Sequence, residues 1–258
     1  MTYILESKSE AERLEIQNAQ PQYSIPIELQ HLKLELNGKK ILDAGCGVGS
    51  LAKILNENFY AVVHACDAAE TRVQQAKKTC SPGVHFFTVD LVSLATPDDF
   101  YDVIFVRFVL EHTRDPQPIL KELRRVLKPN GRLVIIDFDG LIFNIHHHDK
   151  LLVEYLSKFE KELPIDLFIG RKLPRMLSEM ELKVDEFYIQ PLIFQREDLE
   201  AEAENMLMRF QQTESLIKSI LGSEHYERFV DLYLSELRKS QGLFCNKFII
   251  TASKTSGV

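Results

Sequence analysis

Residues 41–52 read ILDAGCGVGSLA, an apolar run that breaks into three alternating glycines and then turns amphipathic. The pattern predicts a strand, a tight glycine turn and a helix start, where bare backbone approaches a nucleotide-like ligand. The glycines are Gly45, Gly47 and Gly49, whereas a dinucleotide fingerprint reads G-x-G-x-x-G with its third glycine inside the helix. This spacing argues against a pyrophosphate site and against a nicotinamide-dependent oxidoreductase.

Two further strand patterns end in an acid. Residues 61–67 read AVVHACD and end in Asp67, 24 positions after Asp43, and residues 84–91 read VHFFTVDL and contain Asp90. A carboxylate at a strand end can accept two hydrogen bonds from ribose hydroxyls. Either acid could instead be a helix N-cap, since acids at strand-to-helix junctions often are.

Two more segments complete the pattern. Residues 101–112 read YDVIFVRFVLEH, and residues 119–137 read ILKELRRVLKPNGRLVIID, a helix, a Lys-Pro-x-Gly turn and a strand. In this order, the five segments resemble the class I S-adenosylmethionine (SAM)-dependent methyltransferases over residues 38–139. The resemblance implies a Rossmann-like α/β fold with a seven-stranded, mostly parallel sheet, an antiparallel last strand and helical cap insertions.

The resemblance also implies SAM as cofactor. It places ribose binding on Asp67 and adenine binding on Asp90, and the full implied set is Asp43, Gly45, Cys46, Gly47, Gly49, Asp67, Ala68, Asp90, Leu91, Arg107 and Phe108. Asp43 is expected to order the glycine loop through backbone amides. Arg107 is expected to contact the methionine portion or an anionic substrate, or else to pair with Glu111 at helical spacing.

Periodicity divides the chain into five parts. We expect an N-terminal helical leader or lid over 1–37, a SAM-binding core over 38–139, and a cap segment with the sixth strand over 140–193. A helical insertion over 194–242 precedes the last strand and tail, 243–258. The late strands are expected at Lys183–Gln190 and Phe244–Ala252. The apolar faces of the insertion must cover either the active site or a second subunit in a homodimer.

Composition narrows the class of partner. The net charge of −7 removes the general attraction on which nucleic-acid binding rests, so no nucleic acid is expected. The helix before the fifth strand and its turn carry basic residues expected on a solvated surface: Lys121, Arg124, Arg125, Lys128 and Arg132. No apolar run approaches 18 residues, no secretory signal is visible, and the four cysteines lack C-x-x-C spacing, so a cytoplasmic protein without a membrane span is expected.

His112 is the candidate general base, because it follows the fourth strand at the carboxyl edge of the sheet and imidazole titrates near neutrality. The alternative is that His112 packs against or hydrogen-bonds the following loop. Tyr23, Asp139 and His146 are candidate substrate contacts from the segments outside the core, and Tyr3, Arg13 and Gln17 are further polar residues of the leader. No metal is expected, because Asp137-Phe138-Asp139 does not reproduce the acid and amide pair of metal-dependent catechol-type enzymes.

The sequence therefore predicts a SAM-dependent methyltransferase that acts on a small molecule, with oxygen, nitrogen and carbon acceptors in that order of preference. Residues 107–110 read RFVL and lack the Asn/Asp-Pro-Pro-aromatic signature of enzymes that act on planar nitrogens, so DNA bases are poor candidates. A protein-modifying methyltransferase and a non-catalytic SAM-binding regulatory subunit are the alternatives.

Overall fold

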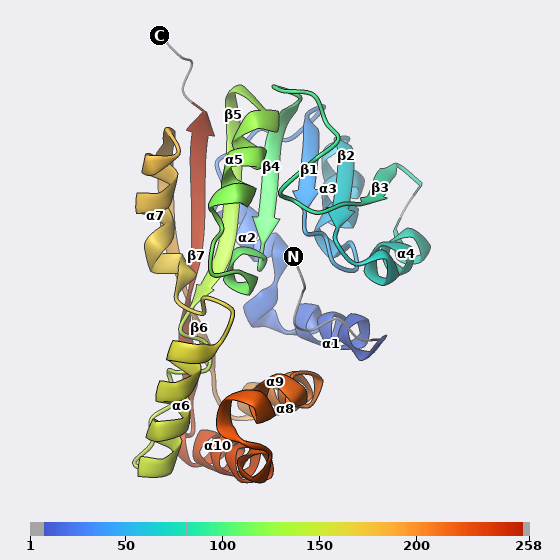
Figure 1. Ribbon diagram of the computed structural model, residues 1–258. Coiled ribbons are helices and arrows are strands. Elements are labelled where there is room, and N and C mark those ends of the chain that lie inside the picture. The colour runs from blue at the N-terminus through green and yellow to red at the C-terminus, as the bar shows by residue number, and fades with distance from the viewer. Residues whose placement is uncertain (1–7, 81, 255–258) are drawn as a thin grey trace.

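The computed structural model describes residues 8–80 and 82–254, and its centre is a seven-stranded sheet (Figure 1). The strand order is β3-β2-β1-β4-β5-β7-β6. The strands are β1 (Lys40–Ala44), β2 (Val62–Asp67), β3 (Val84–Thr88), β4 (Tyr101–Arg107), β5 (Leu127–Asp139), β6 (Leu182–Phe194) and β7 (Leu243–Lys254). β1 to β5 pair in parallel and β7 is antiparallel to both neighbours, as the resemblance implied.

The sheet is buried on both faces, which explains why its strands read as apolar runs instead of alternating ones. Successive side chains of β1 enter opposite layers, with Ile41 packed against α3 (Ser50–Phe59) and Leu42 in the layer that holds α5 (Gln117–Val126) and α7 (Ile169–Glu179). Helix α4 (Glu70–Thr79) lies beside β2 and β3. The carboxyl ends of the parallel strands therefore share one edge of a rigid layer.

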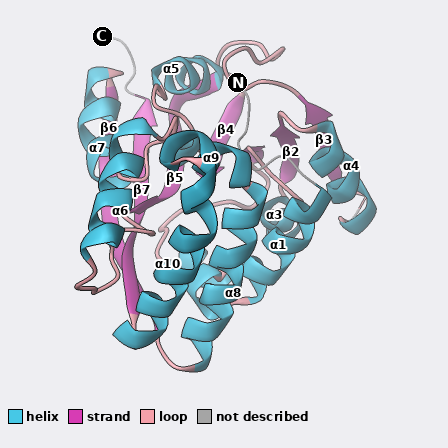
Figure 2. Ribbon diagram, turned by 60° about the horizontal axis from the view of Figure 1, so that its bottom comes forward, coloured by secondary structure: helices cyan, strands magenta, loops and turns pink. Residues whose placement is uncertain are grey.

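A group of helices covers that edge. The leader forms α1 (Lys8–Ala19), the 3-10 turn η1 (Pro21–Tyr23) and α2 (Ile25–Gln30), and the other cap helices are α6 (Lys150–Glu162), α8 (Glu197–Gln212), α9 (Glu214–Leu221) and α10 (Tyr226–Ser240). Short 3-10 turns, η2 (Leu110–His112) and η3 (Ser223–His225), precede α5 and α10. Figure 2 shows α6, α8, α9 and α10 in front of the sheet edge. Among the described residues, no helix combines the length and apolar character that crossing a bilayer requires.

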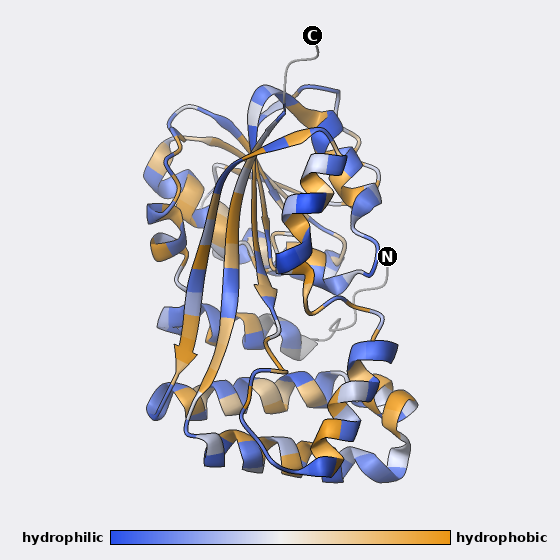
Figure 3. Ribbon diagram, turned by 90° about the vertical axis from the view of Figure 1, so that its left-hand side faces the viewer, coloured by the Kyte–Doolittle hydropathy of each residue, from blue (hydrophilic) through white to orange (hydrophobic). Residues whose placement is uncertain are grey.

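The last two strands are longer than expected and carry the cap. Pairing of β5 with β7 ends at Asp139 and Asn246, but β6 and β7 stay paired as far as Phe194 and Leu243. This two-stranded ladder reaches past the other strands to the cap helices (Figure 3). The apolar faces of α8, α9 and α10 pack with α6 and the ladder into one core of their own.

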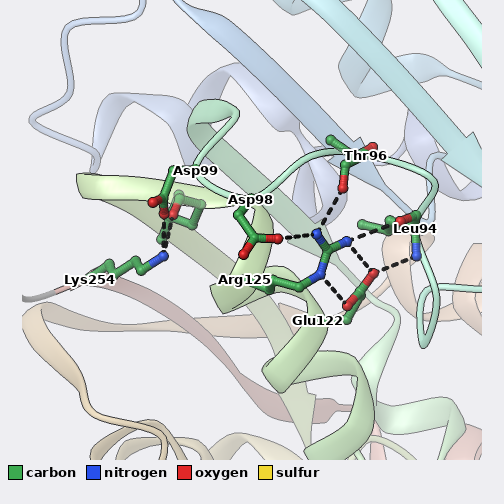
Figure 4. A network of polar contacts seen from close by, with 8 residues as sticks. Leu94, Thr96, Asp98, Asp99, Glu122, Arg125 and Lys254 are labelled. Atoms are coloured by element: carbon green, nitrogen blue, oxygen red, sulfur yellow. Dashed lines mark hydrogen bonds and ion pairs between the residues drawn. The ribbon is translucent and has the colours of Figure 1, made fainter.

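Most of the basic residues predicted to lie on a solvated surface around α5 form ion pairs. These pairs lie away from the sheet edge that the cap helices cover. The Arg125 guanidinium donates to Glu122, to Asp98 and to the carbonyls of Leu94 and Thr96 (Figure 4). Three others also pair with acids: Arg124 with Glu181, Lys128 with Asp102, and Arg132 with Asp185. These contacts fasten the loop before β4 and pair four of the five basic residues with acids.

Candidate active site

The glycine loop between β1 and α3 uses backbone conformations that favour glycine. Gly45, Gly47 and Gly49 have φ of 80°, 54° and 82°. A Cβ on Gly45 would lie 2.4 Å from Cγ2 of Val109, and the Gly45 amide donates to the Cys66 carbonyl at 2.8 Å. The loop is thus tied to the end of β2 and passes close under the segment that follows β4.

Gly49 differs in its role from Gly45 and Gly47. It is the N-cap residue of α3, and a Cβ there would lie 2.8 Å from Sγ of Cys80 and 3.0 Å from Cβ of Ala76. Gly45 and Gly47 line the pocket described below, whereas Gly49 does not. The third glycine therefore serves the packing of α3 against α4.

Asp67 closes the loop from the end of β2. Its Oδ2 accepts a hydrogen bond from the Gly47 amide at 3.0 Å, and its Oδ1 accepts from the Ala69 amide at 2.9 Å and from Arg72 Nη2 at 2.6 Å. Because Ala69 is the N-cap residue of α4, the N-cap alternative for Asp67 is wrong. A carboxylate offers about four lone-pair directions, so Oδ2 retains the capacity to accept from a ribose hydroxyl.

Asp43 and Asp90 stand on either side of Asp67. Asp43 is buried, and its Oδ2 accepts from the Ala52 amide in the first turn of α3 at 3.1 Å. Burial raises the pKa of Asp43 to about 7, against the opposing effects of that bond and of Arg107. Asp90 accepts from the amide two residues later, at 3.1 Å, in a turn that no helix follows, so it is not an N-cap either.

One pocket brings most of the predicted cofactor residues together. It holds about 1130 Å³ of empty space, its opening to solvent included. Its lining includes ten of the implied residues, namely Asp43, Gly45, Cys46, Gly47, Asp67, Ala68, Asp90, Leu91, Arg107 and Phe108, together with His112. The glycine backbone, the acid at the end of β2 and the second acid after β3 fit a nucleoside with a charged tail.

Arg107 lines this pocket, and its guanidinium is bound by residues of the leader. Its Nε donates to Oε2 of Glu28 at 2.7 Å, and its Nη2 donates to the Tyr23 carbonyl at 2.8 Å. Glu28 is fully buried and also pairs with Lys247 at 2.6 Å. The ion pair of Arg107 with Glu111 suggested by their spacing is therefore wrong, because the leader supplies Glu28 from a distant part of the sequence.

His112 lies at the far end of the same pocket, in η2. It is partly buried, and desolvation together with the positive field of Arg209 and Arg13 lowers its pKa to about 3. Its Nε2 lies 3.6 Å from Oε1 of Glu111, which is buried. The imidazole is therefore neutral across the physiological range.

Asp137 positions the turn that carries His112. Its Oδ2 accepts from the amides of Leu110 and Glu111 at 3.0 and 3.3 Å, and its Oδ1 accepts from the Phe138 amide at 2.9 Å. Burial, and then the nearby Glu111, raise the pKa of Asp137 well above its usual range. The end of β5 thus fixes the path of the chain after β4.

The tentative substrate residues lie outside the pocket lining. Tyr23 is fully buried, donates to Oε1 of Glu202 at 3.2 Å and meets Phe108 edge to face at 6.1 Å. It therefore supports Phe108 from behind. Asp139 is buried and accepts from Nε of Arg171 at 2.9 Å, which joins β5 to α7.

His146 is exposed and its ring faces that of His148, with 3.2 Å between the Nε2 atoms. Asp149 caps α6, accepting from two backbone amides at 2.8 and 3.1 Å. Within residues 8–80 and 82–254, no group of three or more His, Cys, Asp or Glu side chains is placed to hold a metal ion. Tyr3 lies outside the described residues.

The structure adds residues from α1 and α8 to the site. Each helix carries a polar stripe at spacings of three and four, consisting of Glu10, Arg13 and Gln17 on α1 and of Glu202, Asn205 and Arg209 on α8. The stripes meet where Arg13 Nη1 donates to Asn205 Oδ1 at 3.1 Å and Arg209 Nη2 donates to Gln17 Oε1 at 3.0 Å. Arg13, Gln17 and Arg209 line the pocket. The sequence signal that could have identified these residues is the presence of polar residues on the otherwise apolar faces of α8.

A second pocket adjoins the first at His112. Glu111, His112 and Arg209 line both pockets. Beyond them the lining comes from α6, α8, α9 and the segments after β5 and α6, and it is mainly apolar: Ile142, Phe159, Leu163, Ile165, Leu167, Met206, Phe210, Thr213, Leu216 and Ile217. A polar junction therefore lies between a pocket over the sheet, lined by both polar and apolar residues, and a mainly apolar pocket inside the cap.

Comparison with known proteins agrees with this geometry. Residues 42–135 match the family model described as a methyltransferase domain. The chain is 30% identical over 114 residues to the ubiquinone/menaquinone biosynthesis C-methyltransferase UbiE of Vibrio vulnificus, covering 42% of this chain and 44% of that protein. It is also 30% identical over 113 residues to a ubiquinone biosynthesis O-methyltransferase of Coxiella burnetii, covering 42% and 48%.

The fold is shared with solved structures at lower identity. Phosphoethanolamine N-methyltransferase 2 of Haemonchus contortus, solved with phosphomonomethylethanolamine and S-adenosylhomocysteine, aligns over 99% of this chain and 61% of that one, with a TM-score of 0.65 and 17% identity. The matches to UbiE and to the O-methyltransferase span less than half of the length of those relatives. Residues 42–135 therefore belong to the class I S-adenosylmethionine-dependent methyltransferases, and the cofactor of this domain is S-adenosylmethionine.

Proposed function

We propose that the chain transfers a methyl group from SAM to a small-molecule acceptor. The observation that carries this proposal is that two neighbouring pockets share three lining residues, Glu111, His112 and Arg209. The first runs from the glycine loop past Asp67 and Asp90 to His112, and the second opens from the junction formed by Glu111, His112 and Arg209. The first pocket would hold the cofactor and the second the acceptor, so that the junction separates donor from nucleophile.

The bound cofactor supplies the electrophile, a sulfonium methyl group, and leaves the protein to align the nucleophile and exclude water. Asp67 and Asp90 would hold the nucleoside and the glycine loop would accommodate it. Helices α1 and α8, joined through Arg13 and Asn205, contribute residues to the wall of the pocket and would shield part of the bound cofactor from solvent. An acceptor with a hydroxyl or an acidic carbon must also lose a proton, and His112 is the nearest candidate to receive it.

The proton affinity of His112 depends on the acceptor. A pKa of about 3 means that protonating the ring costs about 5 kcal/mol more than in water. His112 therefore acts as a base only if the bound acceptor offsets the positive field of Arg209 and Arg13. If it does not, alignment alone drives transfer and His112 positions the acceptor.

The proposed acceptor atom is oxygen, nitrogen or carbon, in that order of preference, and the names of the relatives include one reaction at each. The mainly apolar lining of the second pocket supports a small molecule over a protein side chain. The cap helices cover their own apolar faces, which supports the lid alternative over the homodimer. The four free cysteines are compatible with the proposed cytoplasmic setting.

Calorimetric titration with S-adenosylhomocysteine tests the first step, with reduced nicotinamide cofactor as the control ligand. Micromolar binding of the first ligand alone is expected. Screening acceptors with methyl-labelled SAM then separates a methyltransferase from a non-catalytic SAM-binding subunit. A folded, ligand-free protein that binds neither ligand would contradict the proposal.

His112→Ala tests the junction, with His148→Ala on the exposed surface as the matched control. The change at His112 should lower kcat while S-adenosylhomocysteine affinity stays within about threefold. Because the pKa of His112 is about 3, kcat/KM of the wild-type enzyme should show no ionisation of this residue between pH 5 and 9. Unchanged kcat in His112→Ala would remove His112 from the reaction.

A further inference from the structure

The second pocket is mainly apolar, and most of its polar lining residues are those that it shares with the first pocket. Nine of its thirteen lining residues are apolar, and three of the four polar ones, Glu111, His112 and Arg209, are those shared with the first pocket. Thr213, one turn beyond Arg209 on α8, is the fourth. A ligand there would meet hydrocarbon over most of its surface and polar groups mainly at one end.

Arg209 lines that end, and its side chain also carries an unused donor. Its Nη2 donates to Gln17 Oε1 at 3.0 Å, but its Nε is buried and has no hydrogen-bond partner among the residues that the structure describes. Arg13, in contrast, is engaged by Glu10, Gln17 and Asn205. A buried donor without a partner is unfavourable, so an oxygen atom placed against Arg209 Nε gains a charge-assisted hydrogen bond.

The charges around Arg209 favour an anion. The nearby acids are Glu10, Glu111 and Glu202, and burial raises the pKa of Glu111 and of Glu202, which works against their negative charge. The guanidinium keeps its proton at all relevant pH values. Oε2 of Glu111 is also buried without a partner in the described chain, so a cationic ligand anchored there is the competing arrangement.

We infer that the acceptor is an apolar molecule ending in an anionic oxygen, with that oxygen on Arg209 Nε and its hydrocarbon part in the second pocket. The inference rests on the proposed function, because the polar end would then lie at the junction, next to the methyl donor. Arg209 thereby becomes the residue that selects the acceptor by charge and orients it. Leu216 and its apolar neighbours select it by size.

Three probes, of which two carry the same tail with opposite charge and the third lacks the tail, test the inference by calorimetry in the presence of saturating S-adenosylhomocysteine. These are 4-pentylbenzoate, 4-pentylbenzylamine and benzoate. The first should bind at least tenfold more tightly than the amine, because of its charge, and than benzoate, because of its tail. Equal binding of the two pentyl probes, or tighter binding of the amine, would overturn the inference.

Two variants locate the site. Arg209→Gln should weaken 4-pentylbenzoate at least tenfold, and Leu216→Gln should weaken it while leaving benzoate unchanged. Arg238→Gln, on the exposed face of α10, is the control for loss of an arginine from the cap. If Arg209→Gln fails to fold, the comparison of the three probes on the wild-type protein and the binding of 4-pentylbenzoate to Leu216→Gln still test the inference. Absence of S-adenosylhomocysteine binding would instead refute the proposed function, and tight binding of S-adenosylhomocysteine without discrimination among the probes would refute only the inference.

Discussion

Replacing Asp43 with Asn should stabilise the ligand-free protein more at pH 8 than at pH 5. Asp43 is buried at the end of β1, and its pKa is raised from 3.8 to about 7, so the folded state binds a proton that the unfolded state has released. Where the folded state binds more protons, the free energy of unfolding falls as pH rises. This loss begins near pH 3.8, the ordinary value, and is complete above pH 7.

The magnitude follows from the two pKa values. Relative to a pH below both values, this pKa difference lowers the free energy of unfolding by about 4 kcal/mol at pH 8, where folded Asp43 is ionised. At pH 5 the loss is roughly 1.7 kcal/mol, because only the unfolded state has ionised, and the two losses differ by about 2.5 kcal/mol. In the Asn variant, the amide oxygen can keep the bond from Ala52, whereas its buried NH2 group costs about 1–3 kcal/mol at either pH. That cost cancels when the two pH values are compared.

Urea denaturation of both proteins at pH 5 and pH 8 measures the effect as a change in the free energy of unfolding at constant slope. The variant should gain about 2.5 kcal/mol relative to the wild type between pH 5 and pH 8. Asp231→Asn, at an exposed position on α10, is the control. Its free energy of unfolding should differ from that of the wild type by the same amount at pH 5 and at pH 8. A variant of Asp43 that is equally destabilised at pH 5 and pH 8 would refute the raised pKa.

Three other substitutions test separate parts of the site. Asp67→Ala should weaken S-adenosylhomocysteine more than tenfold in calorimetry, and an unchanged Kd would reduce Asp67 to a support of the glycine loop. Glu28→Ala should lower the free energy of unfolding by about 3–5 kcal/mol, because it leaves Arg107 and Lys247 as uncompensated buried charges, and a loss below 1 kcal/mol in urea would contradict that account. Gly49→Ala should lower Tm, because φ is 82° there and the new methyl group meets α4; unchanged Tm would show that the loop adapts.

The core could be predicted from sequence because its signals are local. The apolar runs that form buried parallel strands, the alternating glycines and the acids that follow β2 and β3 each lie within a dozen residues. Ten of the eleven implied cofactor residues line one pocket for that reason. Gly49 differs because a glycine demanded by helix packing has the same sequence appearance as one demanded by ligand approach.

The parts of the site outside the core could not be predicted, because they depend on contacts between segments that are distant in the sequence. Glu28 reaches Arg107 and Lys247 across 79 and 219 positions, and Gln17 and Arg209 are separated by 192. No spacing rule relates such pairs. Tyr23 and Asp139 are polar residues of the variable segments, as substrate contacts often are, but the structure uses them to fasten Phe108 and α7. The five-part division of the chain and the general-base role of His112 stay predictions.

The long ladder of β6 and β7 bears on how the acceptor range of such an enzyme could change. Phe194 and Leu243 are paired neighbours, so the insertion that carries Arg209 leaves the sheet and returns to it at adjacent points. A segment with adjacent ends can be exchanged for another without moving the strands that hold the cofactor residues. The insertion is in this sense a replaceable cassette, and transplanting 195–242 between enzymes of this fold, together with compensating changes in α1, is a route to new acceptors on an unaltered methyl-donor site.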